Sequence, residues 1–105
     1  MNVDVEVDEA TGALLKLLGE PLRWEIVRRL AVEDLCNCHL VEELGAPQPL
    51  VSHHLRALRQ AGVVRAERFG SFTYYCLVGD VISGLAARLG ALATAPAPRR
   101  RRPCS

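Results

Sequence analysis

The sequence contains four cysteines, and two of them stand two positions apart. The four are Cys36, Cys38, Cys76 and Cys104. The chain has no apolar run near the roughly 18 residues of a transmembrane helix, and its acidic start is unlike a signal peptide. We therefore expect a soluble, cytoplasmic protein that has no membrane partner. In that compartment thiols serve as metal ligands or sensors more often than as structural disulfides.

The pair Cys36 and Cys38 places a condition on the backbone. On an α-helix, positions i and i+2 point about 200° apart, so their side chains cannot hold one small ion. In extended backbone the two side chains share a face. Joint ligation therefore requires that the start of the local helix is non-helical or becomes so, which would couple ligand binding to the geometry of that element.

The spacing of apolar residues predicts the elements around this pair. An apolar helix through 14–18 can end at Gly19, and amphipathic helices follow, of which those at 39–44 and 48–61 end at Gly45 and Gly62. After residue 62 the period changes to that of two strands around Gly70-Ser71, a dipeptide typical of a type II′ hairpin turn. The expected elements are helices at 14–18, 21–31, 39–44, 48–61 and 80–93, and strands at 63–69 and 72–77.

Two short helices, a tight turn and a basic hairpin predict a mainly α fold with a β-hairpin wing, the winged helix-turn-helix. On the helix at 48–61, Val51, Leu55 and Leu58 share one face, and polar side chains occupy the opposite face. His54 lies toward the edge of the core, so we expect it to brace the core. A helix of this kind suits the DNA major groove. The predicted DNA-binding residues are Gln48, Ser52, His53 and Arg56 on that helix, and Arg65 and Arg68 on the hairpin.

The charge distribution supports a nucleic-acid partner. The net charge is only +1, but residues 1–50 carry ten acidic and four basic side chains, whereas residues 51–105 carry two acidic and nine basic ones. A basic half on a small domain favours double-stranded DNA as the partner. Four of the nine basic residues form one run, Arg99 to Arg102, which is also consistent with a solvated tail.

The first and last helices predict self-association. The first is apolar on almost every side, and the last carries a stripe of Val81, Ile82, Leu85, Leu89 and Leu92 that one small body could not wholly cover. We therefore expect a homodimer. The predicted division is a mobile acidic arm at 1–10, a winged helix-turn-helix domain for DNA binding and dimerisation at 11–93, and a disordered Pro/Arg-rich tail at 94–105.

The sequence resembles a known family over roughly residues 13–93. The motifs are D-L-C-N-C-H-L-V-E-E-L-G, from Asp34 to Gly45, and Q-P-L-V-S-H-H-L-R-A-L-R-Q-A-G-V-V, from Gln48 to Val64. They are similar to those of the ArsR/SmtB metalloregulatory repressors, and the C-x-C is typical of their thiol-ligating branch, which includes the arsenic-responsive members. The resemblance implies a homodimeric winged-helix repressor that leaves its operator when a metal or metalloid binds. A two-fold dimer predicts an operator that is an imperfect palindrome.

The resemblance and the thiol chemistry together indicate the inducer. Soft thiolates select soft acceptors, and As(III) and Sb(III) favour up to three sulfur ligands, whereas Zn(II) would require four donors. Arsenite sensors of the family carry C-x-C-x-x-C, but the third position here is Val41. We expect Cys104 as the third ligand, with Cys76 less favoured and a two-sulfur site still open. His39 could bind a borderline metal, but we favour a solvent-facing side chain.

Several alternatives stay open. The same fold could sense other thiophilic ions, Cd(II), Pb(II) or Zn(II), or the oxidation of its thiols to a disulfide. A winged-helix module that binds proteins and senses nothing is a further alternative. We do not expect an enzyme, because the sequence offers neither a C-x-x-C redox motif nor a nucleophile elbow.

Overall fold

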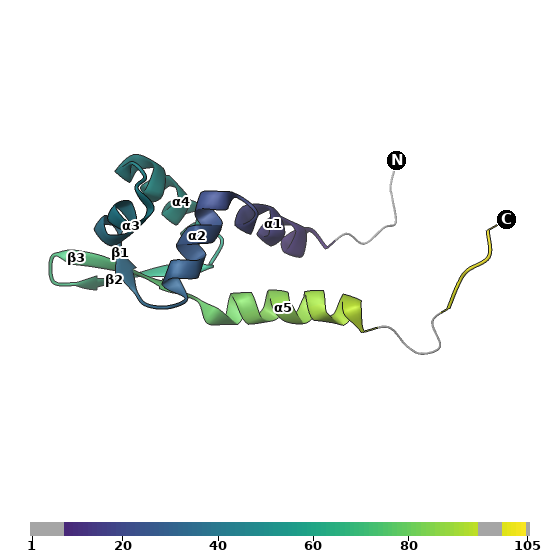
Figure 1. Ribbon diagram of the computed structural model, residues 1–105. Coiled ribbons are helices and arrows are strands. Elements are labelled where there is room, and N and C mark those ends of the chain that lie inside the picture. Colours follow the sequence, from purple (N-terminus) through teal and green to yellow (C-terminus); the bar gives the residue numbers. More distant parts are fainter. Residues whose placement is uncertain (1–7, 95–99, 105) are drawn as a thin grey trace, which may run out of the picture.

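The computed structural model (Figure 1) describes residues 8–94 and 100–104. Within these residues it confirms a mainly helical chain with a β-hairpin. The elements, in chain order, are α1 (Glu9–Leu18), α2 (Pro21–Leu30), β1 (Leu35–Cys36), α3 (Asn37–Leu44), α4 (Gln48–Gln60), β2 (Val64–Phe69), β3 (Phe72–Leu77) and α5 (Gly79–Ala93). None of the described helices has the length and apolarity needed to cross a membrane.

The boundaries follow local capping chemistry. The carboxylate of Asp8 accepts the backbone N–H of Thr11, and that of Glu20 accepts the N–H of Arg23, so both first helices begin at acidic N-caps. Glycines 45, 62 and 70 take positive φ. Of the two turn residues Gly70 and Ser71, the glycine alone has positive φ, as the predicted type II′ turn requires.

The core lies between α2, α3, α4 and the hairpin. The α4 face predicted to point inward is buried, with Val51 and Leu58 at 0% exposure and Leu55 at 1%, and Ile26 and Leu40 meet it at 0%. Burying such side chains contributes about 1.5–3 kcal/mol each. This packing holds α3 against α4, the helix predicted to read DNA.

The sheet has a third strand that the sequence analysis did not predict. Strand β1 pairs antiparallel with β3, opposing Leu35 to Tyr75 and Cys36 to Tyr74, and the strand order is β1-β3-β2. A two-residue strand is too short to show a period of two, so its signal is absent from the sequence. The pairing attaches the first cysteine of the C-x-C directly to the wing.

Helices α1 and α5 carry apolar side chains that stay exposed among the described residues. In Figure 1 both helices lie on the side of the molecule away from the wing tip. Leu85 of α5 is buried, but Leu89 is 42% exposed, Leu92 is 83% exposed and Leu15 of α1 is 44% exposed. This is the uncovered apolar surface expected from the sequence.

The predicted terminal segments are only partly described. Of the arm predicted at 1–10, residues 1–7 lie outside the described residues, and α1 already begins at Glu9. Of the tail predicted at 94–105, residues 95–99 and 105 lie outside the described residues, and residues 100–104 form neither helix nor strand.

Candidate metal centre and nucleic-acid interface

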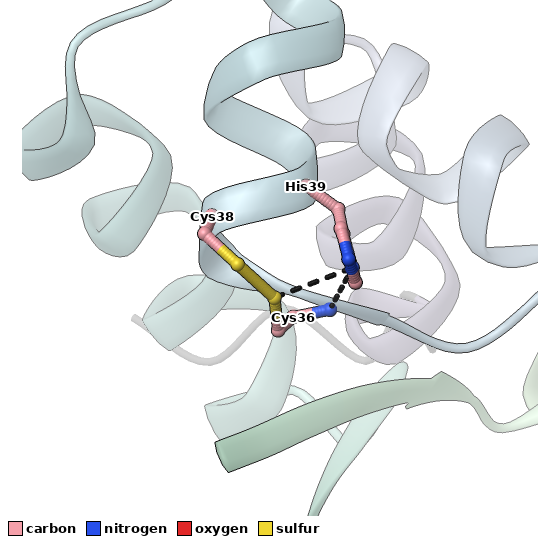
Figure 2. Close-up of side chains that lie close together, drawn as sticks. All are labelled: Cys36, Cys38 and His39. Carbon is pink, nitrogen blue, oxygen red and sulfur yellow. Dashed lines mark hydrogen bonds between the residues drawn. A yellow bond between two sulfur atoms is a disulfide. The ribbon is translucent and has the colours of Figure 1, made fainter.

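The C-x-C pair lies where β1 becomes α3. Cys36 is the last residue of β1 and the N-cap of α3, with extended backbone at φ −85° and ψ 166°, and Cys38 is already inside the helix. The two Cα atoms lie 5.4 Å apart, and the side chains are joined by a disulfide (Figure 2). The non-helical start that joint ligation requires is therefore present, and the two sulfurs lie side by side.

His39 belongs to this cluster, and the expectation of a solvent-facing side chain is wrong. Its ring Nδ1 lies 3.1 Å from the backbone nitrogen of Cys36, whose N–H it accepts, and 3.2 Å from Cys36 Sγ (Figure 2). Because the helix N-terminus leaves backbone N–H groups unpaired, a side-chain acceptor three residues on is drawn back over it. The ring is consequently half-buried.

Cys36, Cys38 and His39 form a donor set suited to a thiophilic ion. Each offers one ligand atom, and these atoms all lie within 4.8 Å of one another. Cys36 is buried and Cys38 is exposed, so an ion could reach the cluster from solvent on the Cys38 side. Two sulfurs and one imidazole nitrogen fit a soft or borderline acceptor. To bind an ion through Nδ1, His39 would have to release the backbone N–H of Cys36. The loss of that hydrogen bond would loosen the start of α3.

The two other cysteines do not join this group among the described residues. Cys76 is 2% exposed in β3, and burial, with a contribution from Asp34, raises the pKa of its thiol to about 11. A thiol that resists ionisation is a poor ligand. Cys104 is exposed in the described part of the tail. The structure thus brings together Cys36 and Cys38 but neither candidate for a third sulfur.

The predicted DNA-binding side chains lie on α4 and on the hairpin. Gln48, His53 and Arg56 are exposed on α4, where Ser52 is half-buried. Arg65 and Arg68 are exposed on β2. Arg65 Nε lies 3.0 Å from a carboxylate oxygen of Glu67. An exposed pair of this kind contributes little to stability, so the guanidinium can exchange partners at low cost.

One contact that the sequence analysis missed joins the cysteine cluster to α4. The side-chain amide of Asn37, the residue between the two cysteines, donates to Ser52 Oγ over 2.8 Å. A hydroxyl both donates and accepts, so it can bond either end of an amide. The sequence carried one signal for this contact. Asn37 lies at the first turn of a helix, and the next helix along the chain has a polar face.

A second contact that the sequence analysis missed holds α4 at His54, away from the side that bonds Asn37. Arg23 Nε donates to Nδ1 of His54 over 3.2 Å, and the guanidinium also donates to the carbonyl of Leu17 over 3.0 Å. His54 Nε2 faces a carboxylate oxygen of Glu20 at 3.5 Å. His54 is 5% exposed, which agrees with its predicted role of bracing the core. Burial lowers its pKa.

Comparison with known proteins places this arrangement in a family. Residues 20–66 match the family described as bacterial regulatory proteins of the arsR family. A helix-turn-helix transcriptional regulator of Methanocaldococcus jannaschii is 38% identical over 77 residues, which cover 72% of this chain and 86% of that one. This chain belongs to the ArsR family. The family and its relatives are transcriptional regulators rather than enzymes.

Two further relatives of this ArsR-family protein are named as repressors. The transcriptional repressor SmtB of Mycobacterium tuberculosis is 46% identical over 72 residues, covering 69% of this chain but only 53% of that one. The arsenical resistance operon repressor of Staphylococcus aureus is 31% identical over 78 residues, covering 70% of this chain and 75% of that one. The chain thus spans about half of the mycobacterial repressor and three quarters of the staphylococcal one.

Solved structures agree on the fold. An ArsR-like regulator from Rhodococcus sp. RHA1 superposes with a TM-score of 0.74 at 24% identity, covering 81% of this chain and 80% of that one. A homodimeric winged helix-turn-helix DNA-binding domain from Mycobacterium bovis gives a TM-score of 0.67 at 24% identity, covering 87% and 90%. The ArsR-family chain therefore has the winged helix-turn-helix fold that its sequence predicts.

Proposed function

We propose that this protein is a homodimeric repressor that binds operator DNA and releases it when As(III) or Sb(III) binds Cys36 and Cys38. The observation that carries the proposal is the group of Cys36, Cys38 and His39 at the first turn of α3, the helix packed against α4. An ion bound by these side chains acts on the first turn of α3 and so on the backbone that positions α4. Ligand binding then has the differential effect on two states that allostery requires.

The DNA side of the proposal rests on exposure and charge. Gln48, His53 and Arg56 are exposed on α4, and Arg65 and Arg68 are exposed on β2 of the wing. A helix in the major groove reads base edges, and flanking arginines bind phosphates. A repressor of this kind acts in the cytoplasm, where the DNA lies.

The inducer side rests on the donor chemistry. Each thiol that binds arsenous acid displaces one hydroxide from arsenic, and that hydroxide leaves as water with the proton of the thiol. Two thiols therefore release two waters. The disulfide must first be reduced to two thiols, which takes two electrons and two protons from a thiol reductant. We propose Cys104 as the third sulfur, since its place in the exposed tail leaves it free of the packing that holds Cys76.

The dimer would use α1 and α5. Leu15, Leu89 and Leu92 are exposed there, and the related domain from M. bovis, of the same fold, is homodimeric. A two-fold axis that relates two chains across this surface would place their α4 helices at equivalent sites on DNA. The operator is then an imperfect palindrome whose half-sites lie about one helical turn apart.

Two observations favour other inducers on the same fold. His39 adds an imidazole donor, which suits Cd(II), Pb(II) or Zn(II) better than As(III). The Cys36–Cys38 disulfide supports oxidation of the thiols as a trigger.

The test is a titration of the reduced protein into a labelled duplex taken from upstream of its own gene, at fixed salt concentration. Fluorescence anisotropy gives the dissociation constant with no addition, with arsenite, with antimonite, with each divalent ion, and after oxidation by diamide. We expect arsenite or antimonite to weaken binding by about 5–150-fold. If only a divalent ion weakens DNA binding, that ion is the inducer, and if only diamide weakens it, the trigger is oxidation of the thiols. If none does, the protein is not a thiol-based sensor.

A further inference from the structure

Asn37 connects the cysteine cluster to the DNA-reading helix. It stands between the two cysteines as the first residue of α3, and its amide Nδ2 donates to Ser52 Oγ on α4 over 2.8 Å. The two residues are 15 positions apart, so the bond ties two separate elements together. Of the residues proposed to read DNA, Ser52 is the one that this bond holds.

The surroundings of Asn37 make that bond its anchor. The side chain is half-buried, and its Oδ1 is buried without a hydrogen-bond partner among the described residues. A buried amide with one unpaired end is held in place by its other end, because losing that bond too would leave a second polar group unsatisfied. The orientation of Asn37 therefore depends on Ser52, and that of Ser52 on Asn37.

We propose that Asn37 is the positioning residue through which the cysteine cluster controls Ser52. This inference rests on the proposed function, namely DNA reading by α4 and sensing by Cys36 and Cys38. In the structure the bond from Asn37 to Ser52 is present while the two sulfurs are joined as a disulfide. An ion held between the two reduced sulfurs sets them farther apart than a disulfide does, so the peptide units on either side of Asn37 shift. A hydrogen bond of 2.8 Å tolerates little displacement, so it breaks, and Ser52 loses the partner that aims its hydroxyl at the DNA.

The proposal predicts an asymmetric effect on the two states of the protein. Without inducer, Asn37 holds Ser52 ready to bind DNA, so removing the amide weakens DNA binding. With inducer the bond is already broken, so the same removal changes little. Asn37→Ala should therefore lower the DNA affinity of the inducer-free protein toward that of the induced protein. A purely structural defect would instead weaken DNA binding in both states.

The experiment is a double-mutant cycle on the reduced, full-length chain. The readout is the ratio of the DNA dissociation constants with and without the ion that acts on the parent. Asn37→Ala and Ser52→Ala should each lower this ratio at least about threefold, by weakening binding only without the ion. The double variant should match the single ones, because both changes break the same bond. Ser52→Thr keeps a hydroxyl and should keep the parental ratio.

The matched control is Gln48→Ala. It removes a second polar side chain proposed to contact DNA from α4, one that is exposed, but Gln48 has no hydrogen bond to α3 among the described contacts. It should weaken binding equally with and without the ion, and so leave the ratio unchanged. The inference is overturned if Asn37→Ala keeps the parental ratio, or if the double variant loses the sum of the two single effects. A parent that responds to no ion or oxidant would overturn the proposed function instead.

Discussion

Arg23 Nε lies 3.2 Å from Nδ1 of His54, and this bond ties the start of α2 to the middle of α4. Because Nδ1 accepts, the ring proton sits on Nε2, which faces Glu20 at 3.5 Å. The same guanidinium donates to the carbonyl of Leu17 at the end of α1. Three helices thus meet at one buried imidazole, which must stay neutral to accept the bond from Arg23.

Acidification should destabilise the fold through His54. Burial lowers the pKa of His54, the charges of Arg23 and His53 act in the same direction, and Glu20 opposes them. Since the folded pKa lies below the unfolded value of about 6.5, the unfolded chain binds more protons, and stability falls as the pH drops through 6.5. One group contributes at most about 1.4 kcal/mol per pH unit.

Urea denaturation at pH 7.5 and pH 5.5, at one protomer concentration, measures this effect. His54→Gln should lose less stability between the two pH values than the parent does. The control is His53→Gln, which changes the exposed neighbour and should retain most of the parental pH dependence. An equal pH dependence in the parent and in His54→Gln would show that another group is responsible.

Replacing an arginine of the proposed DNA surface should weaken binding and reduce its salt dependence. Arg56→Ala or Arg65→Ala removes one exposed guanidinium and, with it, one phosphate contact. The slope of log K against log salt should then fall by about one unit. Anisotropy titrations at several salt concentrations give the slope. Arg28→Ala, which removes an exposed arginine of α2, should leave the slope unchanged.

Loss of either clustered thiol should abolish induction but leave repression. Cys36→Ser and Cys38→Ser each remove a sulfur from a group of only three donors, whereas α4 and the wing keep their surface. Both variants should bind the operator like the reduced parent and fail to release it with As(III). If a Cys36/Cys38 double variant still responds to As(III), the C-x-C pair is not the sensor.

The third ligand can be assigned by comparing three variants. Cys104→Ser should lower the affinity for As(III), whereas Cys76→Ala should not, because that thiol is buried and its pKa is raised to about 11. His39→Gln should lower the affinity for Cd(II) more than that for As(III), since imidazole suits borderline ions. Ion affinities of the reduced protein without DNA give the answer. A large loss in Cys76→Ala with unchanged stability would reverse the assignment.

A charge on the exposed face of α5 should separate the dimer. Leu89 is 42% exposed in the single chain, so Leu89→Glu would bury an unpaired carboxylate only if a partner covers it. The dimer dissociation constant should rise roughly tenfold or more, measured by sedimentation equilibrium. Val32→Glu is the matched control, because Val32 is 81% exposed in the segment after α2. A parent that is monomeric at micromolar concentration would contradict the proposed dimer.

The sequence by itself determined which helices and wing strands form and which faces of them are buried. The periods of 3.6 and 2 are local properties, so they identified the inward face of α4 at Val51, Leu55 and Leu58, and the two strands of the wing. Joint ligation by Cys36 and Cys38, spaced i and i+2, likewise required a non-helical residue at the start of α3, and Cys36 has that conformation.

Only the tertiary structure decided which of those faces meet. The pairing of β1 with β3, the bond from Asn37 to Ser52 and the bond from Arg23 to His54 join residues from 15 to about 40 positions apart. Periodicity cannot reveal such contacts, because it fixes the direction of a side chain relative to its own element and not the partner across the core. The exclusion of Cys76 from the cluster and the inclusion of His39 were settled in the same way, by packing and helix capping rather than by spacing.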